Sequence, residues 1–218
     1  KSAIDKMVSE GKTVSVVAVE NTPTGIIGIS DSIRETSKKT IAELKKLGIE
    51  TAMITGDNTK TAEAVARELG IDRVFAEVLP EDKADYIKEL QSEGKFVAMV
   101  GDGINDAPAL AQADVGIAIG AGTDVAIETG NIVLMRSDPY DIVAAIRLSQ
   151  ATVRKMKQNL IWAATYNTLA IPIAAGALYP AFGLSIRPEI AALLMSGDSV
   201  AVAINAVLLK RVEPKLKV

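Results

Sequence analysis

The residues that could do chemistry gather in one short stretch in the middle of the chain. Asp102, Asn105 and Asp106 lie within five positions of one another. Gly101 and Gly103 stand among them and let the backbone turn tightly beside a bound group. Carboxylate and amide oxygens suit Mg²⁺ bound next to a phosphate, and a solvated turn needs fewer such groups. The spacing therefore predicts a magnesium and phosphate site.

The elements around this stretch are expected to place the acids at the edge of a sheet. Residues 96–100 form an apolar run that predicts a buried strand. Pro108 suits the first turn of a helix, which makes Asn105 or Asp106 the expected N-cap. The acids then stand at the carboxyl end of a strand, where open α/β sheets bind their ligands.

Two further groups are candidates for holding an anion. Thr55, Gly56 and Asp57 follow the strand expected over 50–54, so the hydroxyl and the N–H groups at the start of the next helix are expected to hold a phosphate. Lys83 lies in the first turn of a later helix, where the helix dipole disfavours a cation. This lysine has two interpretations, an anion partner or ordinary exposure on the surface.

Strands and helices alternate over most of the chain, which indicates a parallel, three-layer α/β sheet. A hairpin of two strands, joined by a turn at 21–25, is expected before that sheet. The expected strands cover 13–19, 26–30, 50–54, 74–76, 96–100, 115–119 and 131–135, and the expected helices cover 1–10, 34–47, 59–69 and 80–92.

Charge is divided unevenly along the 218 residues. Residues 1–150 hold 16 basic and 24 acidic side chains, whereas residues 151–218 hold 8 basic and 3 acidic ones. An acidic body argues against nucleic-acid binding, and a basic, apolar tail favours a membrane. Because these 218 residues contain no cysteine and no histidine, they form no disulfide and offer no thiolate or imidazole ligand for a metal.

Two apolar runs, 160–179 and 190–209, are each long enough to span a bilayer core of roughly 30 Å. Basic residues precede the first run and follow the second, which predicts an integral membrane protein in a lipid bilayer, with its catalytic body in the cytoplasm. A pair of buried core helices is the alternative, but such helices need no flanking cations. The flanking residues are Arg154, Lys155, Lys157, Lys210, Arg211, Lys215 and Lys217.

Polar side chains in the two runs fall on single helix faces. Asn159 and Asn205 have a simple interpretation as hydrogen bonds between helices. A charge at bilayer depth costs at least about 2.5 kcal/mol, so Asp198 is expected to bind a transported cation or a proton. One face carries Asn159, just before the first run, with Tyr166 and Asn167 within it; the corresponding face of the second run carries Met195, Asp198, Ser199 and Val202, with Asn205 close by.

In their order along the chain, the motifs resemble those of the haloacid dehalogenase-like phosphotransferases. The exact residues of these motifs resemble those of the phosphorylation domain of heavy-metal P-type ATPases. This resemblance implies that the protein uses Mg²⁺ and ATP and moves a heavy-metal cation across a membrane. The stretches that carry it are 53–58, 79–83, 99–110, 120–126 and 131–135.

The resemblance also implies a role for each site residue. Asp102 would ligate Mg²⁺ with Asp106 in support. Thr55 and Lys83 would hold the aspartyl phosphate, and Asp57 and Asn105 would place the ATP phosphates beside Gly56. The hinge and the nucleotide would be served by Asp31, Arg34 and Gly103.

The family phosphorylates the aspartate of an Asp-Lys-Thr-Gly-Thr motif, and these 218 residues contain no such motif. We therefore expect a carboxyl-terminal portion whose upstream polypeptide is its partner, with no ATP turnover from this portion alone. The expected domains are the end of the nucleotide-binding domain at 1–30, the second part of the phosphorylation domain at 31–150 and two membrane helices at 151–218.

The tail resembles the last two helices of copper-transporting P-type ATPases, in particular the CopB-like subgroup. Asp198 stands where that subgroup has a hydroxyl residue, and a carboxylate is a harder ligand, so zinc, cobalt and iron stay open beside copper. A soluble haloacid dehalogenase-like phosphatase and a non-catalytic truncated subunit are the alternatives from other classes. The resemblance implies an ion site made of Tyr166, Asn167, Met195, Ser196, Asp198 and Ser199.

Overall fold

The computed structural model describes residues 2–9, 12–29, 33–102, 105–120, 128–183 and 187–215. Contacts within the chain divide it into two compact units, residues 1–143 and 144–218. Asp31 and Gly103, both predicted site residues, lie outside the described residues.

The first unit begins with α1 (Ser2–Ser9) and an antiparallel hairpin of β1 (Thr13–Val19) and β2 (Thr22–Ile29). Glu20 and Asn21 have φ of 48° and 63°. Two successive residues with positive φ close a hairpin in a two-residue turn that matches the twist of its strands. The predicted turn over 21–25 is therefore wrong, and the second strand begins earlier than predicted.

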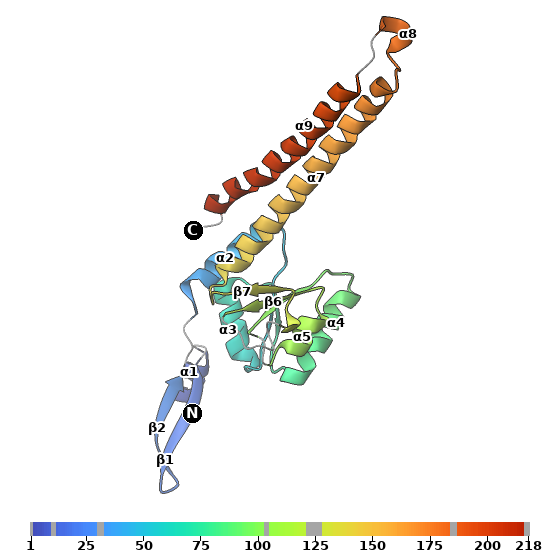
Figure 1. Ribbon diagram of the computed structural model, residues 1–218. Coiled ribbons are helices and arrows are strands. Elements are labelled where there is room, and N and C mark those ends of the chain that lie inside the picture. Colours follow the sequence, from blue (N-terminus) through green and yellow to red (C-terminus); the bar gives the residue numbers. More distant parts are fainter. Residues whose placement is uncertain are drawn as a thin grey trace. The chain divides into compact units, whose positions relative to one another are not determined.

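Strands and helices alternate through the rest of this unit, as predicted. The strands pair in parallel, but in two sheets, one of β3 and β4 and one in the order β5-β6-β7. Figure 1 shows α3, α4 and α5 gathered around these strands. The elements are α2 (Glu35–Lys46), β3 (Ala52–Ile54), α3 (Thr59–Leu69), β4 (Arg73–Phe75), η1 (Pro80–Asp82), α4 (Lys83–Ser92), β5 (Ala98–Gly101), α5 (Ala107–Gln112), β6 (Val115–Ile119) and β7 (Ile132–Leu134).

The core of this α/β body lies where α4 and α5 pack beside β6. Ile87 of α4 and Leu110 of α5 are each only 1% exposed. A Cβ atom on Gly116 would lie 2.6 Å from the carbonyl oxygen of Leu110. Glycine at this position therefore lets α5 lie directly against β6.

Ionic contacts hold the amino-terminal ends of the strands. Thr51 donates from its N–H at 2.9 Å and from its hydroxyl at 2.8 Å to Asp72 Oδ2. Lys45 contacts the other oxygen at 2.8 Å. The hydrogen bond from Lys45, followed by those from Thr51, lowers the pKa of Asp72 from 3.8 to about 2. Nearby, Lys95 forms an ion pair with Glu50, which links the segments that lead into β5 and β3.

The second unit consists mainly of two helices, where the sequence predicted two. They are α7 (Tyr140–Ala174), which begins in the first unit, and α9 (Pro188–Val207); α8 (Tyr179–Phe182) and η2 (Leu208–Lys215) are short. The first helix ends before residue 179, the predicted end of its apolar run. Within the described residues, no helix is both long and apolar enough to cross a membrane. The predicted membrane hairpin is therefore not shown.

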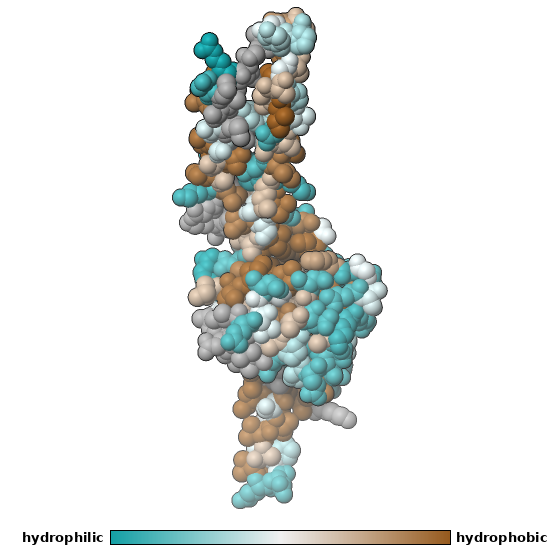
Figure 2. Space-filling view, turned by 45° about the vertical axis from the view of Figure 1, so that its right-hand side comes forward, coloured by the Kyte–Doolittle hydropathy of each residue, from teal (hydrophilic) through white to brown (hydrophobic). Residues whose placement is uncertain are grey.

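Many large apolar side chains of α7 and α9 are exposed. Figure 2 shows these hydrophobic surfaces in brown along the two helices, and hydrophilic side chains over much of the visible face of the body. The exposed set includes Leu160, Ile161, Trp162, Leu169, Ile171, Ile190, Leu193, Val200, Ile204 and Val207.

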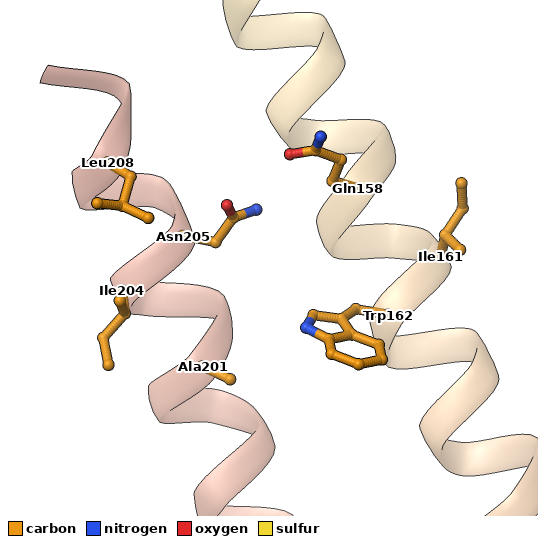
Figure 3. Close-up of a pocket in the computed structure, with 7 residues that line it drawn as sticks. All are labelled: Gln158, Ile161, Trp162, Ala201, Ile204, Asn205 and Leu208. Carbon is orange, nitrogen blue, oxygen red and sulfur yellow. The ribbon is translucent and has the colours of Figure 1, made fainter. Parts of the chain in front are cut away.

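A polar chain of hydrogen bonds joins α7 to α9. Lys155 Nζ donates to Asn205 Oδ1, and Asn205 Nδ2 donates to Asn159 Oδ1, both at 2.7 Å. The predicted bonding of these two asparagines between helices is thus confirmed. Beside them is a cavity of about 580 Å³, into which Trp162 and Asn205 point from facing helices (Figure 3). Its lining residues are Gln158, Ile161, Trp162, Ala201, Ile204, Asn205 and Leu208.

Candidate functional site

The loop after β3 is closed by its own side chains. The hydroxyl of Thr55 donates to Asp57 Oδ2 at 2.9 Å, and the N–H of Asp57 donates to Thr55 Oγ1 at 3.1 Å. Gly56 lies between them, and Asp57 is exposed. The structure thus brings Thr55 and Asp57 together at the carboxyl end of a strand, where a hydroxyl, a carboxylate and solvent access coincide.

The start of α3 is already capped. Asn58 is the N-cap, and its Oδ1 accepts from the N–H of Thr61 at 3.0 Å. Glu77 Oε1, from the loop after β4, accepts from the N–H of Thr59 at 3.3 Å and from its hydroxyl at 3.1 Å. Two of the N–H groups at this helix start are therefore engaged by side chains of the protein.

Glu77 is a residue that the sequence did not point to. Its φ is +58°, which is left-handed backbone. That conformation costs a residue with a side chain about 1–2 kcal/mol, so a glutamate at this position is unusual. Positive φ in a non-glycine residue beside a candidate site is the kind of local strain that functional loops retain.

Lys83 is paired with Asp106 across 23 residues of sequence. Its Nζ donates to Asp106 Oδ1 at 2.6 Å, and the two side chains are 17% and 13% exposed. Lys83 is therefore not a solvated surface lysine, since it pairs with a carboxylate of the protein itself; its contact with a phosphate stays a prediction. Asp106 is the N-cap residue of α5, as predicted, but it makes no capping bond with its side chain. Its carboxylate turns to Lys83 instead.

Gly101, the last residue of β5, makes room for this pair. A Cβ atom at this position would lie 2.5 Å from Asp106 Oδ2 and 2.7 Å from Asp106 Cβ. No real Cβ atom approaches other atoms so closely, so any side chain here would displace Asp106. Glycine at this position is therefore needed for packing against the acid.

Asp102 follows Gly101 directly and is exposed, as is Asn105. Within the described part of the chain, no group of three or more acidic side chains forms a ready metal site. Mg²⁺ is commonly held by one or two carboxylates together with substrate phosphates and water. The donors present, Asp102 with Asp106 nearby in sequence, fit that mode of binding rather than a closed cage.

The structure does not join the two halves of the candidate site. Among the described residues, no hydrogen bond or ion pair links Thr55 or Asp57 to the Lys83–Asp106 pair. The strands that carry them, β3 and β5, belong to separate sheets. Each strand has one partner in the described chain, β4 for β3 and β6 for β5.

The remaining predicted residues lie apart from this site. Arg34 is exposed and immediately precedes α2. On α7, Tyr166 is half-buried and Asn167 is exposed; on α9, Ser196 and Ser199 are exposed. The side chains of Met195 and Asp198 lie outside the described part, so the ion site stays a prediction.

Residues 1–114 match the family of haloacid dehalogenase-like hydrolases. The chain belongs to this family, and its parallel sheets flanked by helices have the corresponding α/β fold.

More specific likenesses cover nearly the whole chain. Copper-exporting P-type ATPase B of Archaeoglobus fulgidus is 55% identical over 209 residues, which are 95% of this chain and 30% of that protein. A copper-exporting P-type ATPase of Vibrio cholerae is 51% identical over 206 residues, 94% of this chain and 22% of that protein. The resemblance to heavy-metal P-type ATPases is thus confirmed.

A solved structure agrees with these sequence relatives. The crystal structure of a zinc-transporting PIB-type ATPase in its E2.Pi state matches with a TM-score of 0.81 and 36% identity, over 95% of this chain and 33% of that chain. The chain therefore spans a third or less of each of these three proteins.

Proposed function

We propose that this chain is part of an ATP-driven exporter of a heavy-metal cation, with copper as the cargo. The observation that carries the proposal is the pair of half-sites at the carboxyl ends of β3 and β5, in a chain more than half identical to a copper-exporting P-type ATPase. Zinc is the alternative cargo, because the similar solved structure is a zinc transporter.

A strand from elsewhere in the same polypeptide would complete the site. In the described chain, β3 pairs only with β4 on one edge, and β5 pairs only with β6 on one edge, so the other edge of each strand has no partner. The Lys95–Glu50 ion pair keeps the segments before these two strands together. A parallel strand inserted between them would carry its own carboxyl end to both half-sites. We propose that this strand bears the aspartate that is phosphorylated.

The residues of this chain would then act as positioning and charge-stabilising groups. The Lys83 ammonium would approach the transferred phosphoryl group while held by Asp106, and the Thr55 hydroxyl would leave Asp57 to donate to the same group. Asp102, with Asp106, would hold Mg²⁺. When bound with ATP, Mg²⁺ would neutralise charge on the phosphates. Asp57 and Asn105 would orient ATP, and Arg34 would serve the hinge.

We further propose that the apolar runs 160–179 and 190–209, which include the carboxyl-terminal part of α7 and most of α9, lie in a lipid bilayer, with the α/β body in the cytoplasm. The support is the exposed apolar surface of the two helices and the basic residues at 154–157 and 210–211. Tyr166, Asn167, Met195, Ser196, Asp198 and Ser199 would line the transport path.

The test is phosphoenzyme trapping in the full-length protein that contains this chain. Incubation with Mg²⁺ and labelled ATP should give an acid-stable phosphoprotein in the wild type and none in Asp102→Asn, which removes one carboxylate charge with little change of shape. Asp85→Asn, an exposed change on α4, is the matched control and should label normally. Normal labelling of Asp102→Asn would contradict the assignment of Asp102 to a Mg²⁺-dependent phosphorylation site.

A further inference from the structure

The loops that follow β3 and β4 are held together beyond the ends of the strands. The N–H of Thr55 donates to the carbonyl of Phe75 at 2.9 Å, and the N–H of Val78 donates to the carbonyl of Thr55 at 3.0 Å. The N–H of Glu77 donates to the carbonyl of Asp57 at 2.9 Å. Both functional residues of the first loop are therefore fixed by backbone bonds to the second.

Glu77 adds a side-chain contact to these backbone bonds. Its carboxylate accepts both the N–H and the hydroxyl hydrogen of Thr59, the first residue of α3. Glu77 is thus hydrogen-bonded to Asp57 through its N–H and to Thr59 through its carboxylate. Glu77 makes both contacts with a φ of +58°.

We propose that Glu77 is a positioning residue for phosphoryl transfer, and this inference rests on the function proposed above. It acts through Thr55 and Asp57. These two side chains bond to each other in the present structure, so a phosphoryl group can recruit Thr55 only if the loop stays in place while that bond opens. The hydrogen bonds of Glu77 to Asp57 and Thr59, which we call the clasp, hold the loop in place. They preorganise the Thr55 hydroxyl as a donor, although Glu77 itself does not touch the substrate.

Three substitutions separate the contributions of the side chain and the backbone. Glu77→Gln keeps an oxygen acceptor and should form phosphoenzyme at close to the wild-type rate. Glu77→Ala loses the acceptor and keeps the unfavourable φ, and it should be about 10- to 100-fold slower at saturating ATP, with ATP affinity little changed. Glu77→Gly relieves the φ but also loses the acceptor, and should lie between them. Glu63→Ala, an exposed glutamate of α3, is the control.

A double-variant cycle asks whether the effect runs through Thr55. If it does, Glu77→Ala should slow the reaction much less in a Thr55→Ala background than in the wild type, because coupled residues give non-additive losses. Fully additive losses would overturn the proposal. So would a Glu77→Ala protein that is phosphorylated at the wild-type rate.

A second measurement does not depend on turnover. Amide hydrogen exchange over residues 55–61 of the full-length protein should speed up in Glu77→Ala and stay slow in Glu77→Gln. Unchanged exchange in Glu77→Ala would refute the clasp even if the wild type proved unable to form a phosphoenzyme. That inability would refute the proposed function instead, so the two failures are distinguishable.

Discussion

The ammonium of Lys83 donates to the carboxylate of Asp106 at 2.6 Å, and both groups are largely shielded from water. One residue begins α4 and the other stands before α5, two helices that pack against each other in the core. Shielding strengthens a charge-assisted hydrogen bond of this kind. The pair therefore sets the position of the cation that the proposed reaction needs.

Lys83→Ala should slow phosphorylation or dephosphorylation about 100-fold while changing ATP affinity little. The reason is that a cation aimed at developing charge lowers the barrier more than it stabilises bound substrate. Single-turnover phosphorylation and nucleotide titration of the same preparation measure the two effects. Lys88→Ala, on the same helix and in an exposed ion pair with Asp85, should change neither. A loss confined to ATP affinity would return Lys83 to an ordinary binding role.

Gly101→Ala should damage both stability and phosphorylation. The added methyl group would overlap the carboxylate of Asp106, and overpacking of this kind costs about 1–3 kcal/mol. Denaturant unfolding should show a lower midpoint, and phosphoenzyme yield should fall with it. Gly25→Ala, where a Cβ meets nothing within 4 Å, provides the control. Equal midpoints for the two variants would contradict the observed closeness of Asp106 to Gly101.

Asp72→Asn should destabilise the protein near neutral pH and lose that effect in acid. Because folding lowers the pKa of Asp72 from 3.8 to about 2, its ionised carboxylate contributes stability above pH 3.8. That contribution disappears as the pH falls from 3.8 towards 2, since the folded protein then takes up the proton as well. Unfolding midpoints of wild type and variant, measured across this range, should converge. Asp5→Asn, an exposed change in α1, should show no such trend.

Asp198→Asn should lower metal-stimulated phosphorylation from ATP and leave expression and phosphorylation from inorganic phosphate intact. If the carboxylate contacts the cargo, replacing it with a neutral amide should also shift selectivity towards softer ions. Metal titration of the phosphorylation reaction measures both effects. Glu189→Gln, an exposed carboxylate in the first turn of the same helix, is the control. Unchanged affinity and selectivity in Asp198→Asn would make this residue structural.

Local sequence signals predicted some boundaries well. Helix α3 begins and ends where predicted because Asn58 caps its first turn and Gly70, with φ of 78°, ends its last. Asp106 occupies the predicted N-cap position for a similar reason, the proline that follows it. Such signals depend on neighbours within a few residues and are readable from sequence.

Contacts between distant residues were not predictable in the same way. The partner of Lys83 lies 23 residues away, and Glu77 meets Thr59 across 18. Both contacts depend on how segments distant in sequence come together in the folded chain. The pattern of alternating elements likewise predicted parallel pairing, but it could not predict that the strands would form two sheets, because hydrogen-bonding partners depend on every strand that is available.

The edges of β3 and β5 that have no partner strand among the described residues have a consequence for handling this polypeptide. Backbone N–H and C=O groups along an unpaired strand edge attract any extended chain that can complete the ladder. At high concentration, these 218 residues expressed alone should therefore self-associate by pairing between copies, and short peptides of high β-propensity should compete with that aggregation. Light scattering during refolding would report it.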